Sequence, residues 1–237
     1  MLSVESVSSG YGKLRILNEV SLSAGPGELT VVVGPNGSGK STLLKTIAGL
    51  IALQGGSISL DGQVISRLAP HVIARSGVAY LPQTESVFTN LTVSENFRMA
   101  GYTIKRADLD ARIQESMAFF PRLASFVGEK AVNLSGGERQ MVAMTMALIR
   151  KPKVVMFDEP TANLSPKIAT EVLSTVRSLA KDKGLTVVLV EQNAKKALEM
   201  GDKAYLLVGG KNVYQGTAAE LLAHKELAQL YLGLRVA

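Results

Sequence analysis

The sequence predicts an α/β fold with a mostly parallel β-sheet, an N-terminal antiparallel β-subdomain and a helical insert. Short β-branched runs, which suit strands buried on both faces, occur at 29–33, 153–157 and 185–190. Apolar and polar residues alternate at 2–10 and 14–24, as in half-buried antiparallel strands. From about 84 to 150, strand patterns disappear and helical spacing dominates.

The first half of the chain places its expected elements around a glycine-rich turn. The strand at 29–33 ends at a glycine, and a helix is expected from 41 to 50. The segment 57–65 is expected to form a hairpin arm around its central Asp-Gly pair. A short strand at 78–81 is ended by Pro82.

The helical insert follows, and Pro121 acts as a breaker within it. A helix at about 166–183 separates two strand-like runs, so this part is expected to be a βαβ unit. Strands at 203–208 and 211–215 are expected to form a hairpin, and the tail 217–233 is expected to be helical. The chain is therefore interpreted as one domain, 1–237, with a core from 1–83 and 152–237 and a helical subdomain at 84–151.

The composition excludes several classes of protein. With 237 residues, of which 46% are hydrophobic, the chain can bury a core and is too apolar for disorder. It has no cysteine, and its two histidines, His71 and His224, lie far apart, which argues against a histidine metal site. The net charge is +6, but the lysines and arginines are scattered along the chain, so no nucleic-acid partner is expected. We expect neither a signal peptide nor a membrane-spanning helix, so another protein must hold this one at any membrane.

A phosphate-binding motif follows the strand at 29–33. Its residues, which match G-x-x-x-x-G-K-[ST] and are followed by Thr42, are Gly34, Pro35, Asn36, Gly37, Ser38, Gly39, Lys40 and Ser41. Glycines let consecutive backbone N–H groups point at phosphate oxygens, and the helix N-terminus adds partial positive charge. Lys40 is expected to reach the β- and γ-phosphates, and Ser41 to offer its hydroxyl to Mg²⁺.

Two acidic residues end the strand-like run at 154–157. At the carboxyl end of a parallel strand, such residues point into the ligand crevice of an open α/β sheet. We expect Asp158 to bind Mg²⁺ through water and Glu159 to polarise the attacking water. Taken alone, this pair of acids could equally be an ordinary strand end.

The segment 134–138, Leu-Ser-Gly-Gly-Glu, opens another helix. Ser135 and Glu138 have the spacing of a capping box, which is a purely local interpretation. A capping box does not require glycines, however, and Gly136 and Gly137 would let a phosphate approach bare backbone N–H groups. Since the first motif already serves this chain's own nucleotide, the second phosphate-binding helix suggests a nucleotide held by another subunit.

These three motifs, in this order and spacing, resemble those of ABC-transporter ATPases, and the resemblance covers essentially the whole chain. It implies a P-loop NTPase (RecA-like) core that hydrolyses ATP with Mg²⁺. It also implies a head-to-tail dimer, in which each ATP lies between the P-loop of one subunit and Ser135, Gly136 and Gly137 of the other.

The resemblance assigns roles to three further positions. Tyr11 resembles the aromatic residue that stacks on adenine, although a lone tyrosine near a strand could simply pack. Gln83 resembles the glutamine that joins the Mg²⁺ site to the helical insert. The segment 162–165 lies where the family has a loop that crosses the dimer interface. We expect the segment from Gln83 to about Phe97 to be the surface that couples to membrane subunits.

Two positions depart from the family pattern. Ser165 stands where aspartate is common, and Gln192 stands where a histidine usually contacts the γ-phosphate. Glutamine can donate a hydrogen bond but cannot become cationic, so stabilisation of transition-state charge is expected to be weaker. Because Glu159 is retained, we still expect hydrolysis, with Gln192 taking part.

Four segments resemble the ATPases of branched-chain amino-acid importers, namely those at 87–96, 120–123, 190–198 and 231–233. Related urea and amide importers share much of this pattern. The implied partners are a second ABC ATPase subunit, transmembrane permease subunits and, indirectly, a substrate-binding protein. The implied location is peripheral, on the cytoplasmic face of the inner (cell) membrane.

Two alternatives remain open at this level. One is a non-transport ABC ATPase of translation or DNA repair, although the former usually have two cassettes in one chain and the latter a long coiled coil. The other is a nucleotide-binding regulatory module without turnover, suggested by Ser165 and Gln192. The residues do not identify the transported molecule, do not distinguish a homodimer from a mixed dimer, and do not set the hydrolysis rate.

Overall fold

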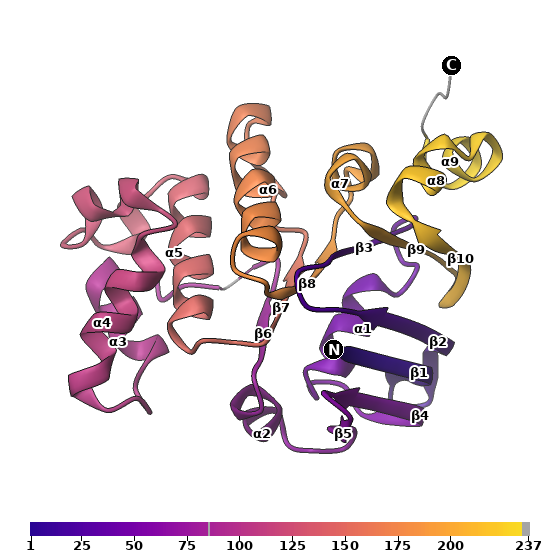
Figure 1. Cartoon of the computed structure of the whole chain (residues 1–237), viewed down its shortest axis with the longest axis horizontal. Coiled ribbons are helices and arrows are strands. Elements are labelled where there is room, and N and C mark those ends of the chain that lie inside the picture. Colours follow the sequence, from indigo (N-terminus) through magenta and orange to yellow (C-terminus); the bar gives the residue numbers. More distant parts are fainter. Residues whose placement is uncertain (85, 234–237) are drawn as a thin grey trace.

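The computed structural model describes residues 1–84 and 86–233 of the chain (Figure 1). The strands are β1 (Leu2–Tyr11), β2 (Leu14–Ala24), β3 (Leu29–Val33), β4 (Leu53–Leu60), β5 (Gln63–Val64), β6 (Val78–Leu81), β7 (Val154–Asp158), β8 (Thr186–Val190), β9 (Lys203–Val208) and β10 (Lys211–Thr217). The α-helices are α1 (Lys40–Ile47), α2 (Pro70–Arg75), α3 (Val93–Ala100), α4 (Arg106–Met117), α5 (Gly136–Ile149), α6 (Pro166–Lys181), α7 (Ala194–Met200), α8 (Ala218–Ala223) and α9 (Lys225–Leu232). Two 3₁₀ segments, η1 (Pro121–Phe126) and η2 (Ala131–Asn133), precede α5.

The central sheet has six strands in the order β10-β9-β3-β8-β7-β6. All neighbours are parallel except the edge pair β9 and β10, which form the expected hairpin. Both faces of β3 are buried: Val31 and Val33 pack on the side of α5 and α6, while Val32 packs toward α1. This confirms the fold class, because β3 is buried at every position and is apolar apart from Thr30, as is typical of a parallel strand covered on both faces.

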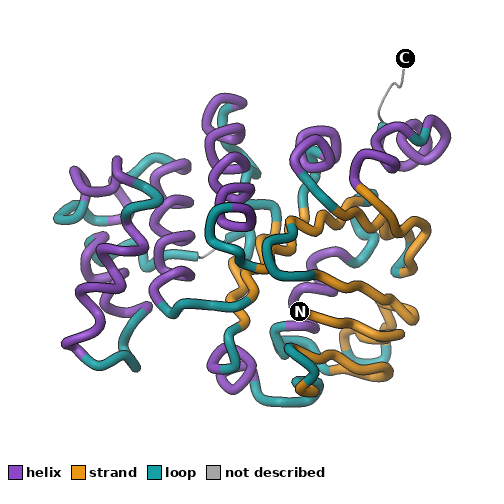
Figure 2. The backbone as a smooth tube through the Cα atoms, in the orientation of Figure 1, coloured by secondary structure: helices purple, strands orange, loops and turns teal. Residues whose placement is uncertain are grey.

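The second sheet is antiparallel, with strand order β2-β1-β4-β5. Its strands are among the orange segments at the lower right of Figure 2. The buried side chains of β1 and β2 share one core with α1, whose Leu43, Leu44 and Ile47 are almost completely inaccessible to solvent. Helix α1 thus packs between strands of the two sheets. The strands expected at 2–10 and 14–24 are confirmed, but their alternation is interrupted near Ser6 and Glu19, where φ is positive and the pairing register shifts.

Helices α3, α4 and α5 lie together beyond β6, at the left of Figure 1. Their buried side chains, such as Phe97 and Met144, belong to the same core as the side chains of α6. Pro121 begins η1 after α4 has ended, as expected of a helix breaker. Within residues 1–84 and 86–233, no helix has both the length and the apolar composition needed to cross a membrane.

The structure differs from the expectations in several short elements. Helix α1 stops at Ile47, because Gly49 adopts a φ of +74°. The tail forms two helices, since the backbone at His224 is extended and its ring caps α9 instead of continuing α8. Helices α2 and α7 were not expected, because six or seven residues span too few turns to show a clear 3.6-residue period.

Candidate functional site

A cavity of about 480 Å³ lies at the carboxyl end of the parallel strands. Its lining contains most of the residues that the motifs predicted: Asn36, Gly37, Ser38, Gly39, Lys40, Ser41, Thr42, Gln83, Glu159 and Gln192, together with Ile16. The predicted residues in this lining come from four separate parts of the chain. Gly34 and Pro35 are connected to the cavity through the side chain of Lys40.

The glycine-rich turn requires its glycines for steric reasons. Gly34 has a φ of +151°, and a Cβ atom there would lie 2.0 Å from the backbone oxygen of Leu207. Helix α1 begins without a side-chain cap, so the N–H groups of its first turn are not occupied by a capping side chain. The buried hydroxyl of Ser38 has no hydrogen-bond partner in the described part of the chain. Unpaired donors at a helix start fit an anionic phosphate ligand.

Lys40 is only 5% exposed and hydrogen-bonds to its own turn. Its Nζ donates to the carbonyl oxygens of Gly34 and Pro35, at 2.9 and 3.1 Å. Burial lowers the pKa of Lys40 below its ordinary value, and the negative charges of Glu159 and Asp158 oppose that shift. The ammonium group is thus held at the cavity by acceptors that a phosphate could replace.

Asp158 is buried, and both of its carboxylate oxygens accept hydrogen bonds. Ser41 donates from Oγ to Oδ1 at 2.8 Å, and Tyr80 donates from its hydroxyl to Oδ2 at 3.0 Å. Burial raises the pKa of the Tyr80 hydroxyl, and the negative charge of Asp158 raises it further. The Ser41 contact joins two motifs that are 117 residues apart in the sequence.

Glu159 stands where the chain turns sharply at the end of β7. Its φ is +50°, an uncommon value for a residue with a side chain. Its backbone N–H donates to the carbonyl oxygen of Val190 at 2.9 Å, and its Oε2 accepts from Nε2 of Gln83 at 3.0 Å. The carboxylate therefore lines the cavity and also contacts Gln83, the residue directly before the predicted insert.

A further buried carboxylate lies behind the cavity. Glu191 is 2% exposed, and its Oε1 accepts from both the backbone N–H and the hydroxyl of Thr161, at 3.1 and 2.8 Å. Burial raises the pKa of Glu191, whereas the hydrogen bonds from Thr161 and from the backbone of Gln192 lower it. Glu191 thus connects the segment after Glu159 to the segment that carries Gln192.

The start of α5 has the predicted capping box. Glu138 accepts the backbone N–H of Ser135 at 2.8 Å, and the Ser135 hydroxyl accepts the N–H of Glu138 at 3.4 Å. Gly136 is exposed, whereas Gly137 is buried against α6, where an added Cβ would lie 2.5 Å from Ile168. Ser135, Gly136 and Gly137 do not line the cavity described above.

Tyr11, at the end of β1, is 53% exposed and does not line the cavity, so its proposed contact with adenine stays a prediction. Ser165 precedes α6 and makes no side-chain capping bond. Sequence reasoning missed Tyr80, Thr161 and Glu191. Glu191 directly precedes the predicted Gln192, and Tyr80 lies three residues before Gln83, but only the pairing of β6, β7 and β8 shows what their side chains contact.

Comparisons with known proteins agree with this geometry. A model of the family described as ABC transporter matches residues 17–162. The chain is 48% identical to a probable branched-chain amino acid transport ATP-binding protein, LivF, of Archaeoglobus fulgidus, with 99% of both chains covered. It is 39% identical to the high-affinity branched-chain amino acid transport ATP-binding protein BraG of Pseudomonas aeruginosa, over 98% of this chain and all of the relative.

Solved structures show the same architecture. One is a dimeric ATP-binding cassette in a post-hydrolysis state, bound to ADP and Pi. It superposes with a TM-score of 0.80 at 25% identity, covering 92% of this chain and 99% of that one.

Proposed function

Because the chain belongs to the ABC transporter family, as one of its ATP-hydrolysing subunits, we propose that it powers the import of branched-chain amino acids or related small amides. The observation that supports hydrolysis most directly is the 2.8 Å contact between Ser41 and Asp158, beside Lys40 and Glu159. The proposed substrate class is supported by relatives that match over the full chain and are named for branched-chain amino acid transport. The alternatives of a non-transport ATPase or a regulatory module are not favoured by these relatives.

The residues around the cavity divide the chemistry of phosphoryl transfer between them. The backbone N–H groups of the glycine-rich turn bind the phosphates, and Lys40 neutralises charge on the β- and γ-phosphates. Glu159 accepts a hydrogen bond from the attacking water and aims it at the γ-phosphate. Gln192 contributes a neutral hydrogen bond, which stabilises developing charge less than a cation would.

The described residues fit a magnesium ion bound together with ATP. Mg²⁺ prefers hard oxygen ligands and commonly takes one or two carboxylates, with the rest from water and phosphates. Ser41 and Asp158 offer such oxygens in direct contact, and Gln83 supplies an amide nearby. No group of three or more acidic, histidine or cysteine residues that could hold a metal without ATP occurs in the part of the chain that the structure describes. When bound, the ion would neutralise phosphate charge during transfer.

The working unit is proposed to be a dimer with a second ABC ATPase subunit, identical or different. The exposed Ser135 and Gly136 would contact the nucleotide held by the partner, because they lie outside this chain's own cavity. This proposal is supported by the dimeric cassette among the similar structures. It also provides a binding partner for those backbone N–H groups at the start of α5 that the capping box does not pair.

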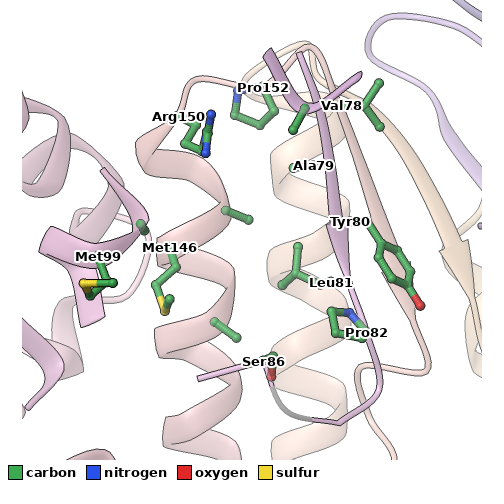
Figure 3. Close-up of a pocket in the computed structure, with 14 residues that line it drawn as sticks. Val78, Ala79, Tyr80, Leu81, Pro82, Ser86, Met99, Met146, Arg150 and Pro152 are labelled. Carbon is green, nitrogen blue, oxygen red and sulfur yellow. The ribbon is translucent and has the colours of Figure 1, made fainter. Parts of the chain in front are cut away.

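A groove between β6, α3 and α5 is our proposed docking surface for the transmembrane permease subunits. It has a volume of about 300 Å³. Figure 3 shows Met99 of α3 and Met146 of α5 on one side and strand β6 on the other, with the Tyr80 ring pointing away from the groove. Flexible methionine side chains suit a surface that must adapt to an apolar partner segment. The exposed Phe88 lies in the segment from Gln83 to about Phe97 that the sequence predicts to couple to membrane subunits.

This groove is linked to the hydrolytic site by a short path. Pro82 lines the groove, and the next residue, Gln83, donates its hydrogen bond to Glu159. A displacement of the permease segment would therefore move Gln83 relative to the carboxylate. Residue 85, within the predicted coupling segment, lies outside the described residues. With permease subunits in the membrane, the proposed location is peripheral, on its cytoplasmic face, and a substrate-binding protein would deliver the solute on the other side.

The test of this function combines turnover with uptake. Purified protein should hydrolyse ATP, and Glu159→Gln should lower kcat by about 100-fold or more, the scale of general-base catalysis. Glu199→Gln, which changes an exposed carboxylate on α7, is the matched control and should have normal turnover. Full activity in Glu159→Gln would contradict the assigned role of that residue.

Uptake decides the proposed cargo. Cells in which only the Glu159→Gln protein is present should lose uptake of labelled leucine, while uptake of an unrelated solute such as glucose should continue. Unchanged leucine uptake would refute the amino-acid assignment but would leave ATP hydrolysis standing.

A further inference from the structure

Two carboxylates are buried in the described part of the chain, Asp158 and Glu191. Asp158 is explained by its contacts with Ser41 and Tyr80 beside the phosphate site. Glu191 takes no part in the hydrolysis scheme above, yet a buried carboxylate is costly unless hydrogen bonds stabilise it. Its position therefore requires its own explanation.

The hydrogen bonds of Glu191 extend the pairing of β7 and β8 beyond the ends of both strands. Asp158 is the last residue of β7 and pairs with Val190, the last residue of β8. The backbone N–H of Glu159 then donates to Val190. Two residues further on, Thr161 donates twice to the Glu191 carboxylate. Beyond the strand ends, a side chain thus replaces the missing backbone acceptor.

Thr161 is also the anchor of the turns that surround it. The N–H of Ala162 donates to the carbonyl oxygen of Glu159 at 3.1 Å, and the N–H of Leu164 donates to that of Thr161 at 3.2 Å. Leu164 in turn packs beside the start of α5, 3.3 Å from where a Cβ of Gly136 would lie. The turn that contains Glu159 is thus fixed at Thr161.

We propose that Glu191 is a positioning residue of the hydrolytic site: by holding Thr161, its carboxylate fixes the turn that carries Glu159 and couples that turn to Gln192. The proposal rests on the ATPase function proposed above. Glu159 has an uncommon backbone conformation, which persists only if the surroundings hold it. Gln192 directly follows Glu191, so any movement of this glutamine toward or away from the phosphate is transmitted to Thr161.

The experiment removes the contact from each side. Thr161→Val is nearly isosteric and deletes only the hydroxyl donor, whereas Glu191→Leu deletes both hydrogen bonds. Glu191→Gln keeps an oxygen acceptor and should be closer to wild type than Glu191→Leu. Thr170→Val is the matched control, since it deletes the same group from an exposed position on α6, where the hydroxyl donates to Pro166.

We expect Thr161→Val to lower kcat for ATP hydrolysis by about tenfold and Glu191→Leu to lower it further, with KM changed by less than about twofold. The double variant should be no slower than Glu191→Leu, because Glu191→Leu alone already removes the hydrogen bond that Thr161→Val deletes. Equal turnover in Thr161→Val and Thr170→Val would overturn the proposal. So would a fall in kcat that is matched by an equal rise in KM.

Hydrogen exchange separates this proposal from the ATPase function, because it needs no turnover. The backbone N–H of Thr161 should exchange about ten times faster in Glu191→Leu than in wild type. If wild type does not hydrolyse ATP, the proposed function fails, and the exchange rate still decides whether Glu191 holds Thr161. Unchanged exchange at Thr161 would refute the positioning role even in an active enzyme.

Discussion

Hydroxyl groups from two different elements hold the carboxylate of Asp158, which lies behind Ser41 of the cavity lining. Ser41 is expected from its motif to be close to the metal, but the hydroxyl of Tyr80 reaches the other oxygen from strand β6. Because both oxygens accept hydrogen bonds, the carboxylate is fixed before any ligand binds. Tyr80 therefore acts on the proposed Mg²⁺ site through Asp158 and does not itself need to touch the ion.

Tyr80→Phe should weaken the Mg²⁺ dependence of nucleotide binding. Loss of one hydrogen bond of about 1 kcal/mol predicts an apparent Mg²⁺ affinity lowered by roughly fivefold, with ATP binding without metal almost unchanged. Titration of Mg²⁺ against a fluorescent nucleotide would measure this. Tyr214→Phe, whose hydroxyl contacts Thr217 and Glu220, is the control and should behave as wild type. An identical Mg²⁺ titration for Tyr80→Phe would show that Asp158 needs no such support.

At the scale of elements, the capping box is the feature that starts several of the described helices. Capping boxes begin α3, α5 and α8, and of the boxes in the described part of the chain only the one on α5 has two glycines between its capping residues. The carboxylate of Glu138 and the hydroxyl of Ser135 fix the backbone there, and their hydrogen bonds lower the pKa of Glu138. The box therefore orders a glycine-rich start that would otherwise be flexible.

Glu138→Ala and Glu220→Ala form a matched pair of variants. Each removes one capping carboxylate and should lower the free energy of unfolding, measurable by urea denaturation. Only Glu138→Ala should also weaken ATP-dependent dimerisation of the Glu159→Gln protein, as followed by size-exclusion chromatography. Equal dimerisation in both variants would argue against a nucleotide contact at the start of α5.

At the scale of the whole molecule, Asp202 joins elements that are distant in the sequence. Its carboxylate accepts the backbone N–H of Leu29 at 2.9 Å and contacts Arg177 and Lys181 of α6 at 2.7 and 3.0 Å. Burial alone would raise the pKa of Asp202, but these partners outweigh it and lower the pKa below its ordinary value. The side chain thus connects α6 to β3, the strand that leads into the glycine-rich turn.

The lowered pKa predicts the pH dependence of this contribution to stability. The unfolded chain takes up the proton first as pH falls, so the stabilisation is complete above the unfolded pKa and is lost as pH falls through the lower folded pKa. Asp202→Asn should be less stable than wild type by about 1 kcal/mol at pH 7. The difference should shrink steadily below about pH 4. Urea denaturation over this range measures both values, and a difference that grows in acid would reverse the assigned sign.

The sequence by itself determined the strands, the helical insert and the motifs, because each depends on neighbours along the chain. Burial of β3 on both faces appears as a continuous β-branched run, and the box on α5 appears as a Ser and a Glu three residues apart. Most of the cavity lining follows from the same motifs, since parallel strands end at one edge.

Only the tertiary structure decided which side chains meet across strands. The hydroxyl of Tyr80 reaches Asp158 and the carboxylate of Glu191 reaches Thr161 because β6, β7 and β8 lie in register, and that register is set by the packing of the whole core. The separation of Tyr11 from the cavity lining is likewise a matter of how the two sheets pack around α1. Local patterns encode what a segment does on its own, whereas contacts between distant segments depend on the free energy of the complete fold.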